Sequence, residues 1–499
     1  MRSVVSKKSL SKMSLSSIFP RFGRIAAIGT ASLSLGLSGC ILGSEHPALD
    51  LDIPNGYRQA PHPSDAAVPV LDWWRGFRSP ELTSLMEAAQ VNNLDIAVAI
   101  AQIIQADAVA GIAGAPLLPS VTGTGSAERG RQSSSGIGSG NGVNSIGSST
   151  FTQFNTTLTA SYMIDFWGKN RATLYAAEET ATASRYNRDV VILTTLVAVA
   201  NTYFQVLAAQ DELRVARRNI AAAERILGLI KQQFNGGTAS QLDLSQQEAL
   251  VATLRATVPP LEVTLQQSID ALALLVGRAP VNLKVTGGTT TQITIPRVTP
   301  GLPSELLYQR PDIRQAEAAL ASSNFSVESA RAAFFPQIQL TGTTGFQSAA
   351  LASLFGPGAW FYTLTAGLTQ PIFDGFLLQN QLKQAQGLQL QNLQTYRKSV
   401  LSAFSDVEKA LVALQKFTLQ ERLQADAVAS SRKAFDVAET QLRGGTVNLI
   451  TVLQTQQTLF TAENTLVLVR LNKLLAASSL FQALGGGWTP RGTLSSLQP

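Results

Sequence analysis

Residues 154–166 alternate between two kinds of side chain. The even-numbered positions, from Phe154 to Phe166, are mostly apolar or aromatic, and the odd-numbered positions are mostly Asn, Thr and Ser. A period of two over this length predicts a β-strand with one apolar and one polar face. Similar alternation elsewhere predicts three more strands. The four predicted strands lie at about 119–130, 151–166, 336–347 and 360–373.

Two other segments carry a helical pattern. Residues 168–235 contain no proline and only one internal glycine, Gly228. At about 1.5 Å per residue, a helix over this segment would span on the order of 100 Å. Residues 375–443 are about as long, and apolar side chains recur every seven residues from Leu393 to Leu414. That is the spacing of a coiled-coil seam, so each segment is predicted to form one long helix.

Shorter helices are predicted before each strand pair and after each long helix. Ser79 followed by Pro80 marks the start of the first one, as an N-cap and a first helical residue. The helices after the long ones are about half as long, so each can cover only the far part of its partner. Two short helices stacked end to end would then run beside each long helix. The predicted bounds are 79–112, 305–334, 241–276 and 449–484.

Prolines interrupt the remaining chain. Pro259-Pro260 falls within the first returning helix and should kink it. Residues 278–304 hold four prolines among Thr-rich stretches, so they are predicted to form a non-helical collar between the two halves of the chain.

The order of helix, two strands, long helix and returning helix occurs twice. Leu118-Pro119 aligns with Phe335-Pro336 at an offset of 217, and residues 165–168 align with 372–375 at 207. The offset changes once, across a Gly/Ser/Asn-rich tract at 133–149, which predicts a longer loop in the first copy. The predicted division is a leader at 1–39, an N-terminal segment at 40–78, repeats at 79–277 and 305–486 around the collar, and a tail at 487–499.

The leader accounts for the basic charge of the chain. Six of the 39 basic residues and none of the 33 acidic ones lie in residues 1–39, so the remainder carries 33 of each. The leader has a basic stretch, a short apolar stretch and then Leu-Ser-Gly-Cys, which resembles the lipobox of bacterial lipoproteins. This resemblance implies a covalent lipid on Cys40, the one cysteine. Ile41 in place of Asp favours the outer membrane, and a nucleic-acid partner is not expected.

The composition argues against an enzyme. The two histidines, His46 and His62, both lie near the N-terminus, so a His-based catalytic or metal site in the long helices is excluded. No cofactor or metal is expected beyond the lipid on Cys40. After the leader, no run of about 20 apolar residues is expected, so a membrane would have to be crossed by strands in a closed barrel. Four strands cannot close such a barrel, which predicts an oligomer with eight, twelve or sixteen strands.

Several motifs resemble those of the TolC-type outer membrane factors, most closely the NodT-like lipoproteins of tripartite drug-efflux pumps. They are Leu-Tyr-Gln-Arg-Pro-Asp-Ile-Arg at 307–314, Phe-Phe-Pro-Gln at 334–337, Gln-Pro-Ile-Phe-Asp-Gly at 370–375 and the paired Gly-Gly-Thr turns. The resemblance implies a mostly helical homotrimer, in which a periplasmic α-barrel of duplicated helical hairpins continues into a 12-stranded outer-membrane β-barrel. It also implies a periplasmic adaptor protein and an inner-membrane pump of the RND type as partners.

The resemblance places a gate and adaptor contact at the two hairpin turns, and aromatic side chains at the membrane interface. Family members often carry carboxylates near the turns. Here only the first turn has one nearby, and no acid lies between Arg443 and Glu463, so a neutral constriction is expected. The interface aromatics are Phe166, Trp167, Phe373 and Phe376. The candidate gate residues are Gly236, Gly237, Thr238, Asp243, Arg443, Gly444, Gly445, Thr446 and Asn448.

The expected function is that of an outer-membrane exit channel that exports small amphiphilic compounds. A duct of the same fold for secreted polypeptides or polysaccharides is an alternative, because the fold alone does not define the cargo. A second alternative, of a different class, is a structural coiled-coil lipoprotein that transports nothing.

Overall fold

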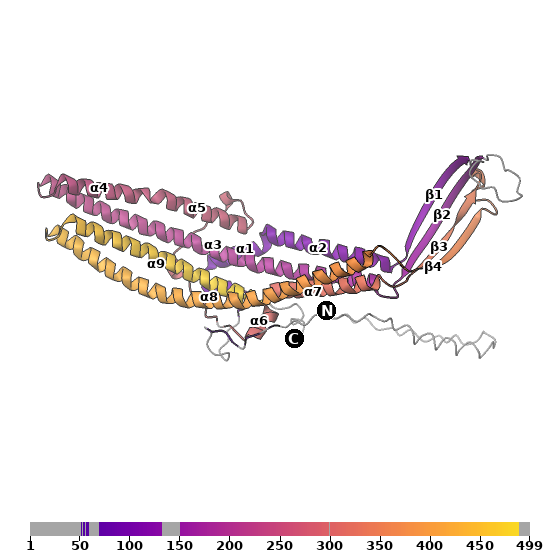
Figure 1. The fold of residues 1–499 in the computed structure, drawn as a ribbon. Coiled ribbons are helices and arrows are strands. Elements are labelled where there is room, and N and C mark those ends of the chain that lie inside the picture. Colours follow the sequence, from indigo (N-terminus) through magenta and orange to yellow (C-terminus); the bar gives the residue numbers. More distant parts are fainter. Residues whose placement is uncertain are drawn as a thin grey trace, which may run out of the picture.

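The computed structural model describes residues 51, 53–54, 56–58, 69–131, 150–298 and 300–488. Cys40, His46, His62 and the predicted leader lie outside these described residues. The described chain is elongated (Figure 1), with a long curved layer of helices and a four-stranded sheet that projects from one end of it. Both helical hairpins turn at the opposite end.

The four strands form one antiparallel sheet. They are β1 (Ser120–Arg131), β2 (Thr150–Ile164), β3 (Gln337–Ser348) and β4 (Trp360–Thr369), in that spatial order. The central pair β2–β3 joins the two repeats, with Thr159 opposite Thr343. Threonine hydroxyls meet on the polar face, where Thr124 and Thr157 are 2.7 Å apart. β1 and β4 are the edge strands, and among the described residues no strand pairs with their outer sides.

β4 is shorter than its predicted span of 360–373. It ends at Thr369, because Pro371 has no N–H to donate to a ladder. The Gln370 side chain there donates to the Phe334 carbonyl oxygen at 3.0 Å instead. β2 ends at Ile164, and the next residue, Asp165, accepts hydrogen bonds from the first backbone amides of the following helix.

The two long helices are α3 (Lys169–Asn235) and α8 (Leu377–Arg443), and each has 67 residues. The two helices start 208 residues apart in the sequence. The sequence alignment of 165–168 with 372–375 used an offset of 207, so it was wrong by one residue. The reason lies in the residues that precede the helices. Gly168 has φ 78° before α3, and its counterpart before α8 is Phe376, with φ 68°. Gly375 also has a positive φ, which adds one non-helical residue to the second junction.

The prediction of single helices at 79–112 and 305–334 is wrong, because each is divided. Asn93 is extended, and its Oδ1 accepts hydrogen bonds from the amides of Asp95 and Ile96, so it caps a new helix. Arg310 is extended because Pro311 follows it. The pieces are α1 (Pro80–Asn92), α2 (Leu94–Gly114), α6 (Pro303–Gln309) and α7 (Pro311–Ala332).

The returning helices differ between the repeats. The first is divided at Thr257 into α4 (Gln241–Ala256) and α5 (Val258–Leu275), directly before Pro259-Pro260. The second, α9 (Leu449–Ala483), is continuous. The collar is not wholly non-helical, since it contains the short 3₁₀ turns Pro280–Asn282 and Thr290–Gln292. Each turn is only three residues long, and Pro280 with its fixed φ begins the first.

Short helices flank each long one in the predicted end-to-end manner. α2 packs on the part of α3 nearest the sheet, and α5 and α4 pack on the rest of it (Figure 1). α7 lies between α3 and α8 near the sheet, and α9 follows it toward the tips. The helices therefore form a layer with two free lateral edges, one along α2, α5 and α4 and the other along α8.

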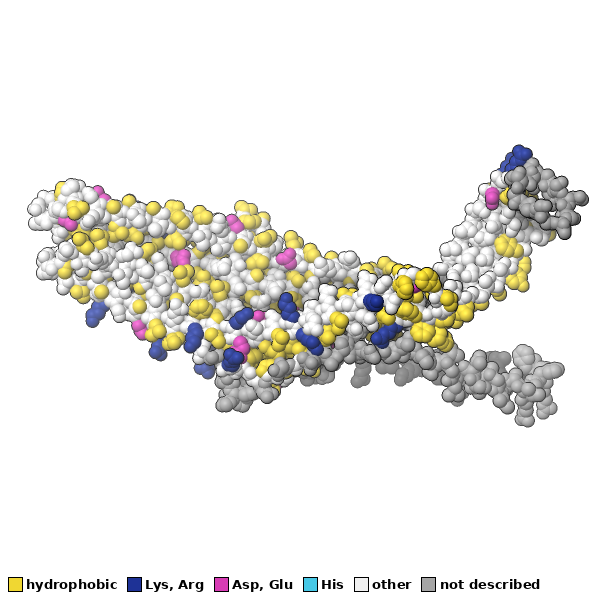
Figure 2. All heavy atoms as spheres, viewed as in Figure 1, with side chains coloured by type: hydrophobic (Ala, Val, Ile, Leu, Met, Phe, Trp, Pro, Cys, Tyr) yellow, Lys and Arg dark blue, Asp and Glu magenta, His cyan; other side chains and the backbone are white. Residues whose placement is uncertain are grey.

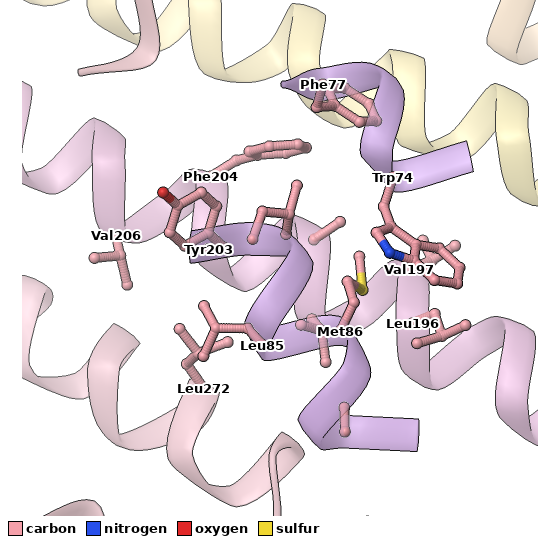
Figure 3. Packing of buried hydrophobic residues seen from close by; sticks show 14 of the residues in the cluster. Trp74, Phe77, Leu85, Met86, Leu196, Val197, Tyr203, Phe204, Val206 and Leu272 are labelled. Carbon is pink, nitrogen blue, oxygen red and sulfur yellow. The ribbon is translucent and has the colours of Figure 1, made fainter. Parts of the chain in front are cut away.

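The largest apolar cluster lies midway along this layer. Trp74 and Phe77, just before α1, pack with Met86, Tyr203 and Phe204 around the long helix (Figure 3). The collar is attached here by two carboxylates. Glu81 accepts from the amide of Thr286 at 2.7 Å, and Asp211 accepts from the amide of Thr290 at 2.9 Å.

Three helical stretches are long and apolar enough to cross a membrane by length and composition alone: Pro80–Leu117, Lys169–Asn235 and Leu449–Ala483. The sequence-based expectation that no such run follows the leader is therefore wrong. In the second and third stretches, neighbouring helices of the same chain bury 50% and 56% of the apolar window. The second stretch is also far longer than the roughly 30 Å of a bilayer core. We interpret the second and third windows as helix-packing surfaces, whereas the window in Pro80–Leu117 is only 17% buried within the single chain.

Candidate functional site at the hairpin tips

The two hairpin turns have the same backbone geometry. Gly237 and Gly445 have φ 77° and 69°, which a residue without Cβ adopts most readily. The next residue in each turn folds back on the long helix. The amide of Thr238 donates to the Gln233 carbonyl at 2.8 Å, and the amide of Thr446 donates to that of Gln441 at 2.9 Å. The structure thus makes Gly236-Gly237-Thr238 and Gly444-Gly445-Thr446 equivalent caps.

The turns differ in the side chains that start the returning helices. In the first, Ser240 caps α4, and the Asp243 carboxylate accepts from the Ser240 amide at 3.0 Å and its hydroxyl at 2.7 Å. These hydrogen bonds lower the pKa of Asp243 below its ordinary value of 3.8. In the second turn, Asn448 caps α9 and accepts from the amide of Thr451 at 3.1 Å. The carboxylate of the first turn is thus replaced by a neutral hydroxyl in the second.

One carboxylate links the two hairpins near their tips. Glu439 on α8, whose side chain is only 13% exposed, lies 2.7 Å from the Arg443 guanidinium and 3.6 Å from that of Arg225 on α3. Nearby ion pairs stay within one hairpin, such as Arg255 with Glu224 and Lys231 with Glu248. The Arg225–Glu439 pair therefore connects the first hairpin to the second.

An apolar cluster supports this connection. Ile226 and Ile230 of α3 are 1% exposed and pack with Phe435 and Leu442 of α8 and with Leu449 of α9. Burial of one such isoleucine contributes about 1.5–3 kcal/mol, whereas an ion pair at a partly exposed site contributes about 0.2–1 kcal/mol. The cluster supplies most of the adhesion between the tips, and the charged pair adds a smaller, directional contribution.

The predicted interface aromatics gather where the sheet meets the helices, but they do not behave alike. Trp167 is half-buried: its indole donates to the Pro336 carbonyl at 2.8 Å and stacks on Phe335 with ring centroids 4.7 Å apart. Phe373 and Phe376 are 81% and 63% exposed. Figure 2 shows hydrophobic side chains gathered at this junction and along one margin of the sheet. Trp167 holds the end of β2 against the Phe335–Pro336 segment. Phe166, Phe373 and Phe376 form an exposed apolar belt.

Sequence reasoning missed Glu439 and Arg225. The signal for the first was present, because Glu439 and Arg443 are spaced four apart on one helix. Nothing local indicates Arg225, which is distant in sequence and meets Glu439 only through the packing of the two hairpins. Among the residues that the structure describes, no group of three His, Cys, Asp or Glu side chains is placed to hold a metal ion.

A duplicated pair of helical hairpins that continues into a four-stranded sheet is the fold of a TolC-like channel, with a periplasmic helical barrel and an outer-membrane β-barrel. The chain belongs to the outer membrane efflux protein family, which matches residues 85–278 and 302–486. It is thus an outer-membrane component of an efflux system.

Named relatives align over nearly the whole chain. The pyoverdine export outer membrane protein OpmQ of Pseudomonas putida is 40% identical over 459 residues, which cover 91% of this chain and 96% of that protein. The toluene efflux pump outer membrane protein TtgF of Pseudomonas putida is 32% identical over 92% of this chain and 96% of that protein.

Solved structures agree with the fold. The outer-membrane channel OprN superposes with a TM-score of 0.80 at 25% identity, covering 90% of this chain and all of that one. The open state of the Neisseria gonorrhoeae MtrE outer membrane channel has a TM-score of 0.77 at 26% identity, covering 89% of this chain and 98% of that one.

Proposed function

We propose that three copies of this chain form a duct through the outer membrane, which a periplasmic adaptor and an inner-membrane pump use as their exit. The duct catalyses no reaction and needs no cofactor apart from a lipid on Cys40, which anchors the mature N-terminus. The pump type that the motif resemblance implies is RND. The proposal rests on the hairpin tips. There the two turns have the same backbone geometry, and the Arg225–Glu439 pair connects the two hairpins.

The two lateral edges of the helical layer support self-association. The α2 edge exposes apolar side chains such as Val98 and Ile112, and the α8 edge exposes Leu401 and Leu423. These surfaces differ, so a head-to-tail ring covers both kinds of edge, whereas a two-fold dimer that pairs one kind of edge with itself leaves both copies of the other kind uncovered. The free strands β1 and β4 lie on the same two sides, and an unpaired edge in lipid is not tolerated.

The proposed gate opens when the second hairpin moves away from the first. In a closed ring of three chains, three Arg225–Glu439 pairs together contribute about 0.6–3 kcal/mol to the closed state. Adaptor binding at Gly236, Thr238, Gly444 and Thr446 would need to favour the open form by more than this amount, together with any part of the Ile226–Ile230 cluster that becomes exposed.

Small amphiphilic compounds are the proposed cargo. Pyoverdine is a second candidate, because relatives at 40% and 37% identity are named for pyoverdine export. Deletion of the chain separates these possibilities. Increased sensitivity to a panel of dyes, detergents and antibiotics indicates the first cargo, and loss of pyoverdine from the medium without altered sensitivity indicates the second.

Adaptor contact can be tested by cysteine crosslinking in cells. Gly236→Cys and Gly444→Cys are suitable because both positions have negative φ, −84° and −81°. Apart from Cys40, the chain contains no other cysteine. Both variants are expected to crosslink to one periplasmic adaptor. Gly123→Cys in β1, where a Cβ meets nothing within 4 Å, is the matched control at the other end.

Crosslinks from both tip positions but not from position 123 support the proposal. If neither tip position captures a periplasmic protein in cells that are actively exporting, the tips are not the adaptor contact.

A further inference from the structure

The last turns of the two hairpins are balanced in charge. Residues 224–256 contain three basic and three acidic side chains, and residues 432–463 again contain three of each. The first set is Arg225, Lys231, Arg255, Glu224, Asp243 and Glu248. The second set is Arg432, Lys433, Arg443, Asp436, Glu439 and Glu463.

Most of these carboxylates have a cationic partner. Glu224 lies 2.5 Å from Arg255, and Glu248 lies 3.4 Å from Lys231. Glu463, which is 8% exposed, pairs with Arg432. Glu439 lies between two arginines, as described above.

Two carboxylates have no such ion pair, and each has another source of compensation. Asp436 follows Lys433 and Arg432 by three and four residues on α8, a spacing that places opposite charges on one helical face. Asp243 lies in the first turn of α4, where the helix N-terminus and the Ser240 amide and hydroxyl stabilise its charge.

The most exposed ion at the turns is a cation. The Arg443 side chain is 61% exposed, whereas the Glu439 side chain to which it binds is 13% exposed. Between Arg443 and Glu463 the sequence contains no acid, so the second turn presents Asn448 and Thr451 where the first presents Ser240 and Asp243.

A pore selects cations through rings of carboxylates and anions through rings of basic side chains. We propose that the tips of this chain do not select cations, and that the duct accepts organic anions among its cargo. This inference rests on the proposed duct. If three chains converge at their tips, each ring of carboxylates is matched by a ring of basic side chains at nearly the same height.

The test is the ion selectivity of the purified full-length protein in planar lipid bilayers. Under a potassium chloride gradient, the expected permeability ratio of potassium to chloride is about 1, within about twofold. Potassium glutamate replaces potassium chloride in a second measurement, and glutamate is expected to carry current as an organic anion. Arg225→Gln is measured beside the wild type, because loss of the link between the hairpins favours the open duct.

Asn448→Asp tests whether the tips set the selectivity. Aspartate is as good an N-cap as asparagine, so α9 should keep its start while each chain gains one carboxylate at the turn. A severalfold preference for potassium is expected. Asn472→Asp adds the same charge about 36 Å further along α9, several screening lengths away, and should leave the ratio unchanged.

A cation preference of about tenfold or more in the wild type overturns this inference, but it does not contradict the proposal that the protein forms a duct. An equal response to Asn448→Asp and Asn472→Asp also overturns it, because the selectivity then lies elsewhere. If neither the wild type nor Arg225→Gln conducts, the duct itself is wrong and this inference falls with it.

Discussion

The contacts of Glu439 depend on how the two hairpins pack against each other. Its pair with Arg443 lies within one helix and follows from sequence spacing, but its contact with Arg225 requires the two hairpins to be side by side. Asp243 shows the reverse, because its role as the capping-box partner of Ser240, the N-cap three residues earlier, is local and follows from sequence spacing.

Arg225→Gln should favour the open duct. The variant removes the contact between the hairpins in each of three chains, which changes the ratio of open to closed forms by roughly threefold to 150-fold. Bilayer conductance measures this change. Arg255→Gln is the control, since it removes an equal charge from a pair inside the first hairpin. Equal conductance of the two variants would mean that the Arg225 contact does not hold the gate.

Asp243→Ala removes the N3 carboxylate of the capping box and should loosen the first turn of α4 by about 0.3–1 kcal/mol, which is up to about fivefold faster amide hydrogen exchange there. Because the folded-state pKa of Asp243 is below 3.8, its contribution is present above that value and is lost as pH falls through the folded-state pKa. The difference between variant and wild type should therefore shrink in acid. A difference that stays unchanged at a pH below the folded-state pKa of Asp243 would contradict the role of the carboxylate.

At the scale of elements, periodicity predicted most of the architecture. The strands, the two 67-residue helices and the flanking short helices all follow from apolar spacing and from the absence of proline. Sequence reasoning predicted the interruption near Pro259-Pro260, and it missed the local signal of Pro311 for the break at Arg310. The break at Asn93 depends also on a tertiary partner. The Asn93 side-chain amide donates to the Leu275 carbonyl at 2.8 Å, which holds this residue outside the helix. The one-residue shift at Phe376 was hidden for a different reason, since a non-glycine residue seldom adopts a positive φ.

Two glycines should respond to alanine in opposite directions. Gly445→Ala forces a Cβ into the left-handed region and should destabilise the second turn by about 1–2 kcal/mol. Gly228→Ala lies inside α3, where a Cβ meets nothing within 4 Å, and should stabilise that helix by up to about 1 kcal/mol. Hydrogen exchange at each site measures both effects. A stabilising Gly445→Ala would mean that the turn is not held in this conformation.

At the scale of the whole molecule, four strands and two uncovered edges make the single chain incomplete. The sequence predicted this incompleteness from the strand count, but it left eight, twelve or sixteen strands open. The reason is physical: closure depends on the curvature of the helical layer and on the contact between copies, and neither is encoded in local periodicity.

Leu364→Arg should reduce assembly in the outer membrane. Leu364 lies on the apolar face of β4 and is 81% exposed in the single chain, and an arginine on the lipid face near mid-membrane costs about 2–4 kcal/mol per chain. Heat-modifiable oligomer in outer-membrane fractions should fall. Thr365→Arg places the same charge on the opposite, polar face and should be tolerated. Equal loss from both variants would contradict the assignment of the faces.

The most direct measurement of the central claim is the single-channel conductance of the reconstituted wild-type protein and of a variant that lacks residues 442–448. The deletion removes the second turn and the Arg443 partner of Glu439. If the tips gate a duct, the wild type should conduct weakly and the variant severalfold more. Lipid-inserted oligomers of both forms that never conduct would contradict the account.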